Sequence, residues 1–199
     1  MPYNGSEPAG TIVVDTRAKF LYHVGRDGTA RRYGVGVGKP GFGWKGQHPI
    51  TRKAEWPSWT PPKAMIARER KKGRILPAHM KGGEANPLGA RALYLGSTLY
   101  RIHGTNDLAS IGNSGSAGCI RMFNHDAIFL FPKVPLGTRV VIRDYADSVA
   151  IEGEAVTLSK GAHISRRRQH VEQRMSDELD GQSGSFVESL LERQDHQHA

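Results

Sequence analysis

The only cysteine of the chain, Cys119, follows His103 by sixteen residues, within the run YRIHGTNDLASIGNSGSAGCIRM. The residues between them are mostly small or polar, whereas a thiol that serves only packing is expected in an apolar run. A thiolate is a strong nucleophile, and a nearby imidazole can take up the proton of the thiol. Cys119 and His103 are therefore candidates for the nucleophile and the general acid/base of an acyl transfer.

The backbone around this pair offers two further parts of an acyl-transfer site. The N–H groups of Gly118 and Cys119 are candidates for stabilising the oxyanion that forms when a thiolate attacks a carbonyl. A third group should orient the imidazole of His103. The side chain of Asp107 and the carbonyl of Gly104 are both close in sequence, and the sequence leaves these two alternatives open.

The segment NHDAIFLFPKV predicts a short helix after the cysteine. Asn124 is its expected N-cap, Asp126 suits its positive start, and Pro132 ends it. We expect the neighbouring His103 and the start of this helix to lower the pKa of the Cys119 thiol.

Short segments rich in β-branched and aromatic residues, separated by turn signals, predict a mostly β domain of the sandwich or barrel type. The Asp27–Gly28 pair is a hairpin-turn signal. Small residues alternate with Val in RRYGVGVG, which is typical of a strand that another backbone crosses closely. The predicted strands cover residues 11–15, 19–25, 31–38, 90–96, 98–104 and 137–145.

Residues 38–90 predict a long ordered loop or a set of turns, because they are rich in Gly, Pro and Trp. Trp56 and Trp59 would form a stiff wall there or, alternatively, cap one end of the barrel. The basic cluster IARERKKGR in this segment is expected to be solvated. We expect a catalytic domain over residues 10–145 and a polar tail over 148–199, either helical or disordered.

The chain of 199 residues carries a formal net charge of +9, and this charge is concentrated in the predicted domain. Residues 1–159 hold 22 Lys and Arg against 12 Asp and Glu, a balance of +10. A basic domain favours polyanionic partners. We expect no nucleic acid among them, because the cluster RERKKGR contains no aromatic side chain on which bases could stack.

Several other classes are disfavoured by composition. A single cysteine excludes an internal disulfide and a zinc site built from several cysteines, and the nine histidines show no metal-binding spacing. We expect neither a metal nor another cofactor. No run approaches the ~20 apolar residues of a transmembrane helix, and MPYNGSEPAGTIVVD does not read as a secretory signal.

The segments IHGTN, SAGCIRM and VPLGTRVVI occur here in an order and spacing that resemble the L,D-transpeptidase catalytic domain family (YkuD/ErfK-like). GVGKPGF, KAEWPSWTPP and NPLGARALYL are similar to further segments of that family, and the resemblance spans roughly residues 10–143. It implies a β-sandwich or barrel-like domain with one short helix after the catalytic cysteine.

The resemblance also implies an activity. In this family a cysteine attacks the diaminopimelate–D-alanine bond of a tetrapeptide stem in peptidoglycan and forms a thioester. The acyl group then passes to an amine, giving a 3→3 cross-link, a bond to a lipoprotein lysine, or exchange with a D-amino acid. The alternatives are an L,D-carboxypeptidase, another cysteine hydrolase of the wall, or a non-catalytic wall-binding module. The presence of both Cys119 and His103 counts against the last.

The resemblance assigns roles to single residues. Cys119 is the nucleophile, His103 is the general acid/base, and the carbonyl of Gly104 orients the imidazole. The N–H groups of Gly118 and Cys119 serve the oxyanion. The candidates for substrate binding are Ser116, Arg121, Asn106 and Trp59.

One position departs from the family, because Ala117 stands where its members often have His or Ser, which removes one polar contact. The implied partners are peptidoglycan stem peptides, with a wall-linked lipoprotein as a second candidate. Stem peptides carry several carboxylates, so a basic domain suits them. The implied location is the periplasm or cell wall, although no export signal is visible in this sequence.

Overall fold

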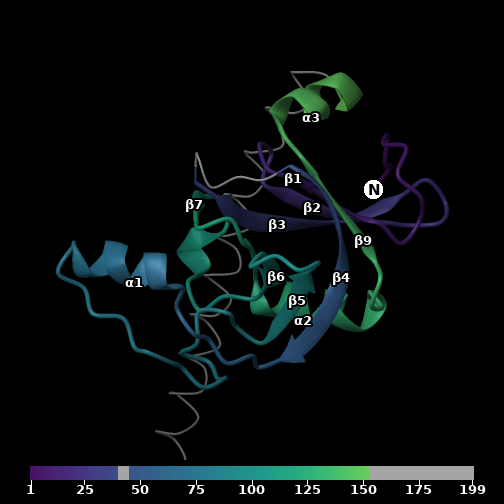
Figure 1. The fold of residues 1–199 in the computed structure, drawn as a ribbon. Helices are drawn as coiled ribbons and strands as arrows, with labels where there is room; N and C mark the ends of the chain where they lie inside the picture. Colours follow the sequence, from purple (N-terminus) through teal and green to yellow (C-terminus); the bar gives the residue numbers. More distant parts are fainter. Residues whose placement is uncertain (40–44, 153–199) are drawn as a thin grey trace, which may run out of the picture.

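The computed structural model of the chain describes residues 1–39 and 45–152. Short strands dominate it and form one strongly curved sheet (Figure 1). The predicted polar tail lies almost entirely outside the described residues, so its structure and the domain boundaries stay predictions.

Every predicted strand is present, and three further strands join them in the described residues. The strands are β1 (Ile12–Asp15), β2 (Phe20–Val24), β3 (Ala30–Gly38), β4 (Gly46–Glu55), β5 (Arg91–Leu95), β6 (Arg101–His103), β7 (Ser114–Ser116), β8 (Ile120–Met122) and β9 (Arg139–Arg143).

The sheet closes on itself. Its strand order is β2-β1-β9-β4-β5-β6-β8-β3-β7, and β2 also pairs with β3. Most neighbours are antiparallel, but β6 runs parallel to β8, β1 to β9 and β3 to β7. The predicted mostly β, barrel-like domain is therefore confirmed.

Buried side chains form two clusters, one on each face of the sheet. The larger cluster includes Leu21, Ile102 and Ile120. Side chains alternate between the faces of a strand, so Phe20 and Tyr22 belong to the second cluster, which packs with loop residues including Ile111 and Phe123. The connection between His103 and Cys119 thus contributes to the core as well as to the candidate site.

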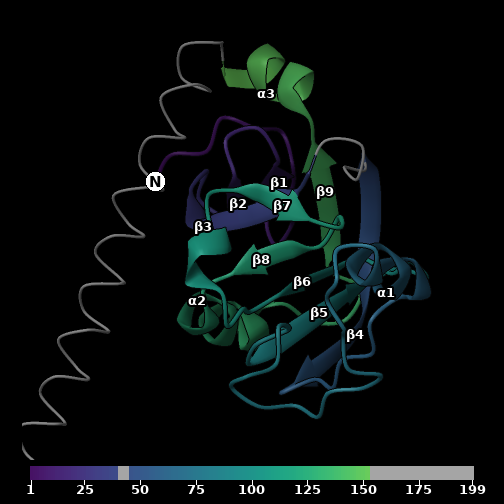
Figure 2. The ribbon, with the colours of Figure 1, turned by 90° about the vertical axis from the view of Figure 1, so that its left-hand side faces the viewer.

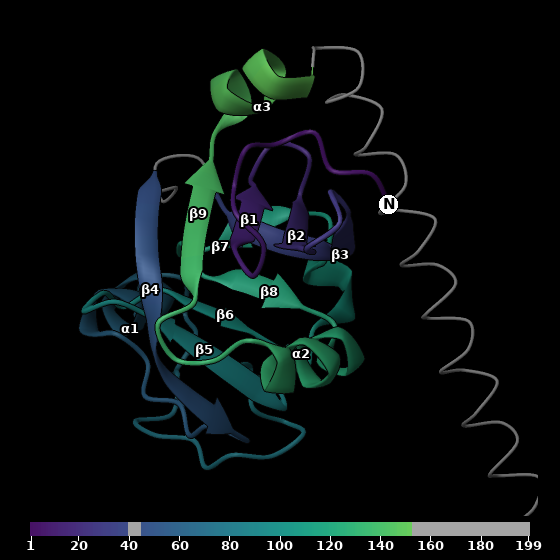
Figure 3. The same cartoon turned by 90° about the vertical axis from the view of Figure 1, so that its right-hand side faces the viewer.

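Three α-helices accompany the sheet in the described part: α1 (Lys63–Arg70), α2 (Asn124–Leu130) and α3 (Tyr145–Glu152). The predicted helix after the cysteine is α2, which packs against the larger cluster through Ala127 and Leu130. Figures 1 and 3 show α3 standing beyond the end of β9. The sequence did not predict α1 or α3.

The prediction of one long loop over residues 38–90 is wrong in two places, because β4 and α1 both lie within it. The sequence does not predict β4, because Ile50 is its only buried residue and no alternation of apolar residues marks the strand. Its ladders to β5 and β9 hold it in place instead. Helix α1 buries no residue, in agreement with the expected solvated basic cluster.

The prediction of Asn124 as an N-cap is also wrong, since the cap position falls on Phe123 and Asn124 is the first residue of α2. The Asn124 Oδ1 atom instead accepts a hydrogen bond from the Ala90 N–H at 2.9 Å. A Cβ atom on Gly104 would collide with that oxygen. Asn124 therefore ties the helix to the chain that follows His103, and glycine is needed there for close approach.

The close backbone crossing expected over residues 31–38 is found at Gly36, where an added Cβ would collide with the carbonyl oxygen of Ser110. We predict that Gly36→Ala lowers the free energy of unfolding by about 1–3 kcal/mol, as overpacking typically does. Urea unfolding followed by circular dichroism measures this change. The matched control is Gly115→Ala, where an added Cβ meets nothing within 4 Å; equal losses in the two variants would contradict the crossing.

Candidate active site

Two short parallel strands, β6 and β8, build the candidate site and lie side by side in Figure 2. In their register Ile102 is opposite Ile120, and His103 is opposite Arg121. Both isoleucines belong to the core. Because successive side chains point to opposite faces, His103 and Arg121 lie on the outer face, and so does Cys119, which precedes β8.

The imidazole of His103 is buried and held by its own backbone neighbour. The residue is 4% exposed, and Nδ1 lies 2.5 Å from the carbonyl oxygen of Gly104. A carbonyl only accepts hydrogen bonds, so Nδ1 carries the proton and Nε2 is the basic nitrogen. The carboxylate of Asp107 instead lies 3.7 Å from the Arg121 guanidinium. Of the two groups that the sequence left open, Gly104 contacts the imidazole.

Burial lowers the pKa of His103 to about 4, and the positive charges of Arg121 and Arg101 act in the same direction. The carbonyls of Gly104 and Leu88 oppose this shift but do not outweigh it. At neutral pH the imidazole is therefore uncharged and able to accept a proton.

The thiol of Cys119 is half-buried, and its Sγ atom lies 3.8 Å from the carbonyl oxygen of Leu99. Burial raises the pKa of Cys119, and the charge of Arg101, hydrogen bonds from the backbone and side chain of Arg101, and the charge of Arg121 only partly offset this effect. The expectation of a lowered thiol pKa is therefore wrong. The neutral His103 supplies no positive charge.

The predicted helix start also fails to stabilise a thiolate. Strand β8 lies between Cys119 and α2, so the helix does not begin at the sulfur. The resting pair thus consists of a neutral thiol and a neutral imidazole, so a thiolate forms only when the imidazole takes the thiol proton during attack.

Ser116 holds the backbone around the cysteine. Its hydroxyl donates to the carbonyl of Cys119 at 2.6 Å and accepts from the N–H of Gly118 at 3.1 Å. Gly118 has a φ of +106°, a conformation that favours glycine. Ser116 is 3% exposed, so in this conformation it positions the turn. The Gly118 N–H is occupied, and the Cys119 N–H is the better placed oxyanion candidate.

The remaining predicted substrate-binding residues lie at different distances from this centre. Arg121 is beside His103, and Asn106 is an exposed loop residue whose amide donates to the Ala85 carbonyl at 2.9 Å. Trp59 pairs with Met80 through two backbone hydrogen bonds. In the described residues, no hydrogen bond or ring contact links Trp59 to the residues around Cys119.

The prediction from sequence missed two residues at the site, Arg101 and Asn124. The two-residue period of a strand could have revealed Arg101, since it shares a face with His103. No sequence signal marks Asn124, because its contacts with residues 89, 90 and 104 depend on the fold.

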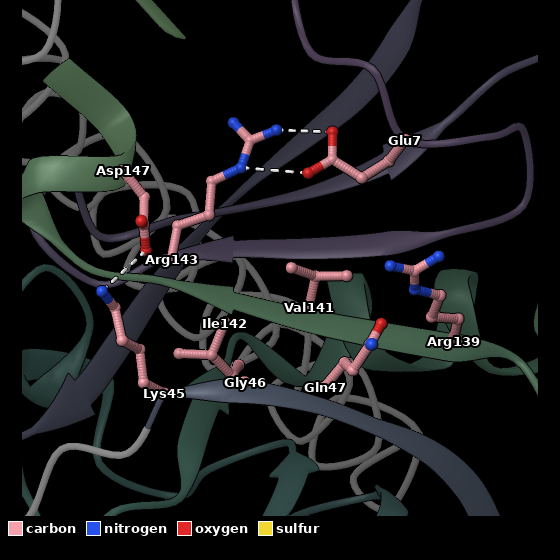
Figure 4. A pocket seen from close by; sticks show the side chains of 9 residues that line it. All are labelled: Glu7, Lys45, Gly46, Gln47, Arg139, Val141, Ile142, Arg143 and Asp147. Carbon is pink, nitrogen blue, oxygen red and sulfur yellow. Dashed lines mark hydrogen bonds and ion pairs between the residues drawn. The ribbon is translucent and has the colours of Figure 1, made fainter. Parts of the chain in front are cut away.

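A hollow of about 400 Å³ lies elsewhere, between β9, the start of β4 and the N-terminal segment (Figure 4). Figure 4 shows the Arg143 guanidinium paired with the Glu7 carboxylate at its edge. No candidate catalytic residue lines this hollow. Within residues 1–39 and 45–152, no three His, Cys, Asp or Glu side chains gather as a metal site would require, and no helix is long and apolar enough to cross a membrane.

The relatives found by comparison with known proteins all carry the same family name. The family model described as YkuD, L,D-transpeptidase catalytic domain, matches residues 9–142. The chain is 39% identical over 139 residues to the probable L,D-transpeptidase YbiS of Escherichia coli K12, covering 68% of this chain and 44% of that protein. The putative L,D-transpeptidase YqjB of Bacillus subtilis is 34% identical over 155 residues, covering 73% of this chain and 79% of that protein. The chain thus spans less than half of the length of its Escherichia coli relative.

Among solved structures, L,D-transpeptidase 3 of Mycobacterium tuberculosis has a similar fold. The TM-score is 0.52 at 15% identity, with 68% of this chain and 61% of that chain covered. An L,D-transpeptidase of Mycobacterium smegmatis gives 0.50 at 21% identity, covering 67% of this chain and 58% of that chain.

The burial of His103 predicts a particular dependence of stability on pH. The unfolded imidazole takes up a proton near ~6.5, whereas the folded one does so only at a pKa of about 4. Between these values the unfolded chain binds more protons, so the free energy of unfolding falls as the pH falls. The loss should be on the order of 3 kcal/mol across this window.

Urea unfolding at several pH values tests this prediction. The loss should be smaller by this amount in His103→Gln, where a residual loss comes from His23 and Glu7, whose pKa values are also lowered. It should be undiminished in the control His79→Gln, which changes an exposed histidine in the loop after α1. If the free energy of unfolding falls equally steeply with falling pH in the wild type and in His103→Gln, the imidazole is not buried in its neutral form.

Proposed function

The chain belongs to the L,D-transpeptidase catalytic domain family, and from this premise we propose that it is a peptidoglycan L,D-transpeptidase with Cys119 as nucleophile. One observation carries the proposal. Cys119 and His103 share the outer face of two parallel strands, with a neutral imidazole available as base. This arrangement suits nucleophilic catalysis on an acyl group.

In the first half of the reaction, the donor is a tetrapeptide stem. Nε2 of His103 takes the thiol proton as Sγ of Cys119 attacks the carbonyl carbon of the diaminopimelate–D-alanine bond. The Cys119 N–H donates to the oxyanion, and the Gly118 N–H can join it if it leaves the Ser116 hydroxyl. As the C–N bond breaks, the imidazolium returns its proton to the leaving D-alanine, and a thioester remains.

In the second half, an acceptor amine attacks the thioester carbonyl and gives a proton to His103. The C–S bond breaks, the thiolate leaves, and the imidazolium protonates it, which restores the resting pair. The acceptor is the amine of a second stem, a lipoprotein lysine or a D-amino acid. Because peptidoglycan is the substrate, we place the activity in the periplasm or cell wall.

The proposal predicts a covalent intermediate that intact-protein mass spectrometry detects. Incubation with a tetrapeptide-stem muropeptide should add the mass of the donor without its terminal D-alanine, and D-alanine should appear in solution. Cys119→Ala should give no adduct while keeping the stability of the wild type. His103→Gln should form the adduct at least about 100-fold more slowly, as expected on loss of a general base.

The released products distinguish transfer of the acyl group to an amine from its hydrolysis by water. In the presence of a free D-amino acid, a transpeptidase yields the exchanged tetrapeptide, whereas a carboxypeptidase yields only the tripeptide. An adduct that forms equally on Cys119→Ala, or tripeptide as the sole product, would contradict the proposed activity.

A further inference from the structure

A row of large side chains crosses the outer face of the sheet and ends at the nucleophile. Arg52 of β4 is opposite Tyr94 of β5, and Tyr94 is opposite Arg101 of β6. Continuing the β6–β8 register by one residue places Arg101 opposite Cys119. Four neighbouring strands therefore align two guanidinium groups, one aromatic ring and the thiol.

Both guanidinium groups contact the same ring. The central carbon of the Arg52 guanidinium lies 3.4 Å from the centroid of the Tyr94 ring, and that of Arg101 lies 5.1 Å from it. Each contact is favourable by itself. Two cations that share one ring also repel each other, and an anion between or beside them would relieve this repulsion.

These two arginines differ from the other arginines beside the site. Arg91 is paired with Glu55 at 3.1 Å, and Arg121 is paired with Asp107 at 3.7 Å. Within the described ranges, no carboxylate pairs with Arg52 or Arg101, and the buried Nε of Arg101 has no hydrogen-bond partner. A buried N–H without an acceptor is costly, and a carboxylate is the acceptor that fits a guanidinium best.

The adjacent row on the same face runs from Ala54 through Ala92 to His103. Ala92 is 0% exposed and His103 is 4% exposed, so this row is covered and a ligand reaches the thiol along the cationic row. Arg52 is exposed, and Arg101 and Cys119 are half-buried. A chain lying across these strands can thus reach both the cationic row and the thiol.

We propose that Arg52, Tyr94 and Arg101 form a carboxylate-binding subsite that holds an acidic acyl donor with its reacting carbonyl at Cys119. The identification of the donor as a stem peptide rests on the proposed function. The preference for an anion beside Cys119 does not rest on the proposed function. Tyr94 keeps the two guanidinium groups in place, and the guanidinium groups bind a carboxylate of the donor that does not react.

The test uses Cys119 as its own reporter, since it is the only thiol. Intact-mass spectrometry measures its alkylation rates with iodoacetate, which carries a carboxylate, and with iodoacetamide, which is neutral. Both reagents react with the same thiolate, so their rate ratio cancels any change in the thiol pKa. The ratio for the protein should exceed that for N-acetylcysteine amide.

Arg101→Gln should lower this ratio by about fivefold, the effect of roughly 1 kcal/mol of charge interaction. Arg52→Gln, which removes the more distant charge, should lower it by about twofold. Arg101→Lys should retain most of the ratio, because the charge remains. Added salt should bring the wild-type ratio toward that of Arg101→Gln.

The control is Arg26→Gln, which removes one exposed charge from the turn between β2 and β3. Its ratio should equal that of the wild type. An unchanged ratio in both Arg52→Gln and Arg101→Gln would overturn the subsite, and so would an equal decrease in Arg26→Gln.

The two proposals can fail separately. A shifted alkylation ratio without any thioester from a stem peptide supports the anionic subsite and rejects the stem-peptide donor. A thioester with an unchanged ratio rejects the subsite and leaves the proposed activity standing. If both hold, amidation of the donor carboxylates should raise KM in the wild type and have a smaller effect in Arg101→Gln.

Discussion

The parallel pairing of β6 with β8 is the constraint on which the rest of the site depends. It fixes His103 beside Arg121 and brings Cys119 next to Arg101, while Ile102 and Ile120 anchor the same strands in the core. A slip of β8 by one residue would turn that strand over, bringing Ile120 to the outer face and moving Arg121 and the adjacent Cys119 away from His103. Burial of two isoleucines therefore sets the geometry of the reactive pair.

The contacts around this pairing hold the reactive groups without charging them. Gly104 orients the imidazole, Ser116 ties the turn before the thiol, and Asn124 anchors the chain after His103. The same enclosure removes water, which disfavours both imidazolium and thiolate. The result is a neutral acid–base pair, with Arg101 as a positive group available to an arriving anion.

Much of this fold could be predicted from the sequence, because most strands are short runs rich in β-branched and aromatic residues that end at turn signals. The reactive pair could be predicted too, since a single thiol in a small, polar segment has few structural uses. Strand β4 could not, because it buries only Ile50, and β7 and β8 have just three residues each. The raised pKa of Cys119 and the contacts of Asn124 depend on three-dimensional enclosure, which local sequence does not encode.

The neutrality of the pair is the central claim, and the pH dependence of Cys119 alkylation by iodoacetamide tests it most directly. The account predicts one titration, with the rate rising until the pH exceeds ~8.5, the ordinary pKa of a thiol, and no reactive plateau at lower pH. His103→Gln should leave this profile essentially unchanged. A plateau of reactive thiolate between pH 5 and pH 7 that disappears in His103→Gln would show a thiolate–imidazolium pair and contradict the account.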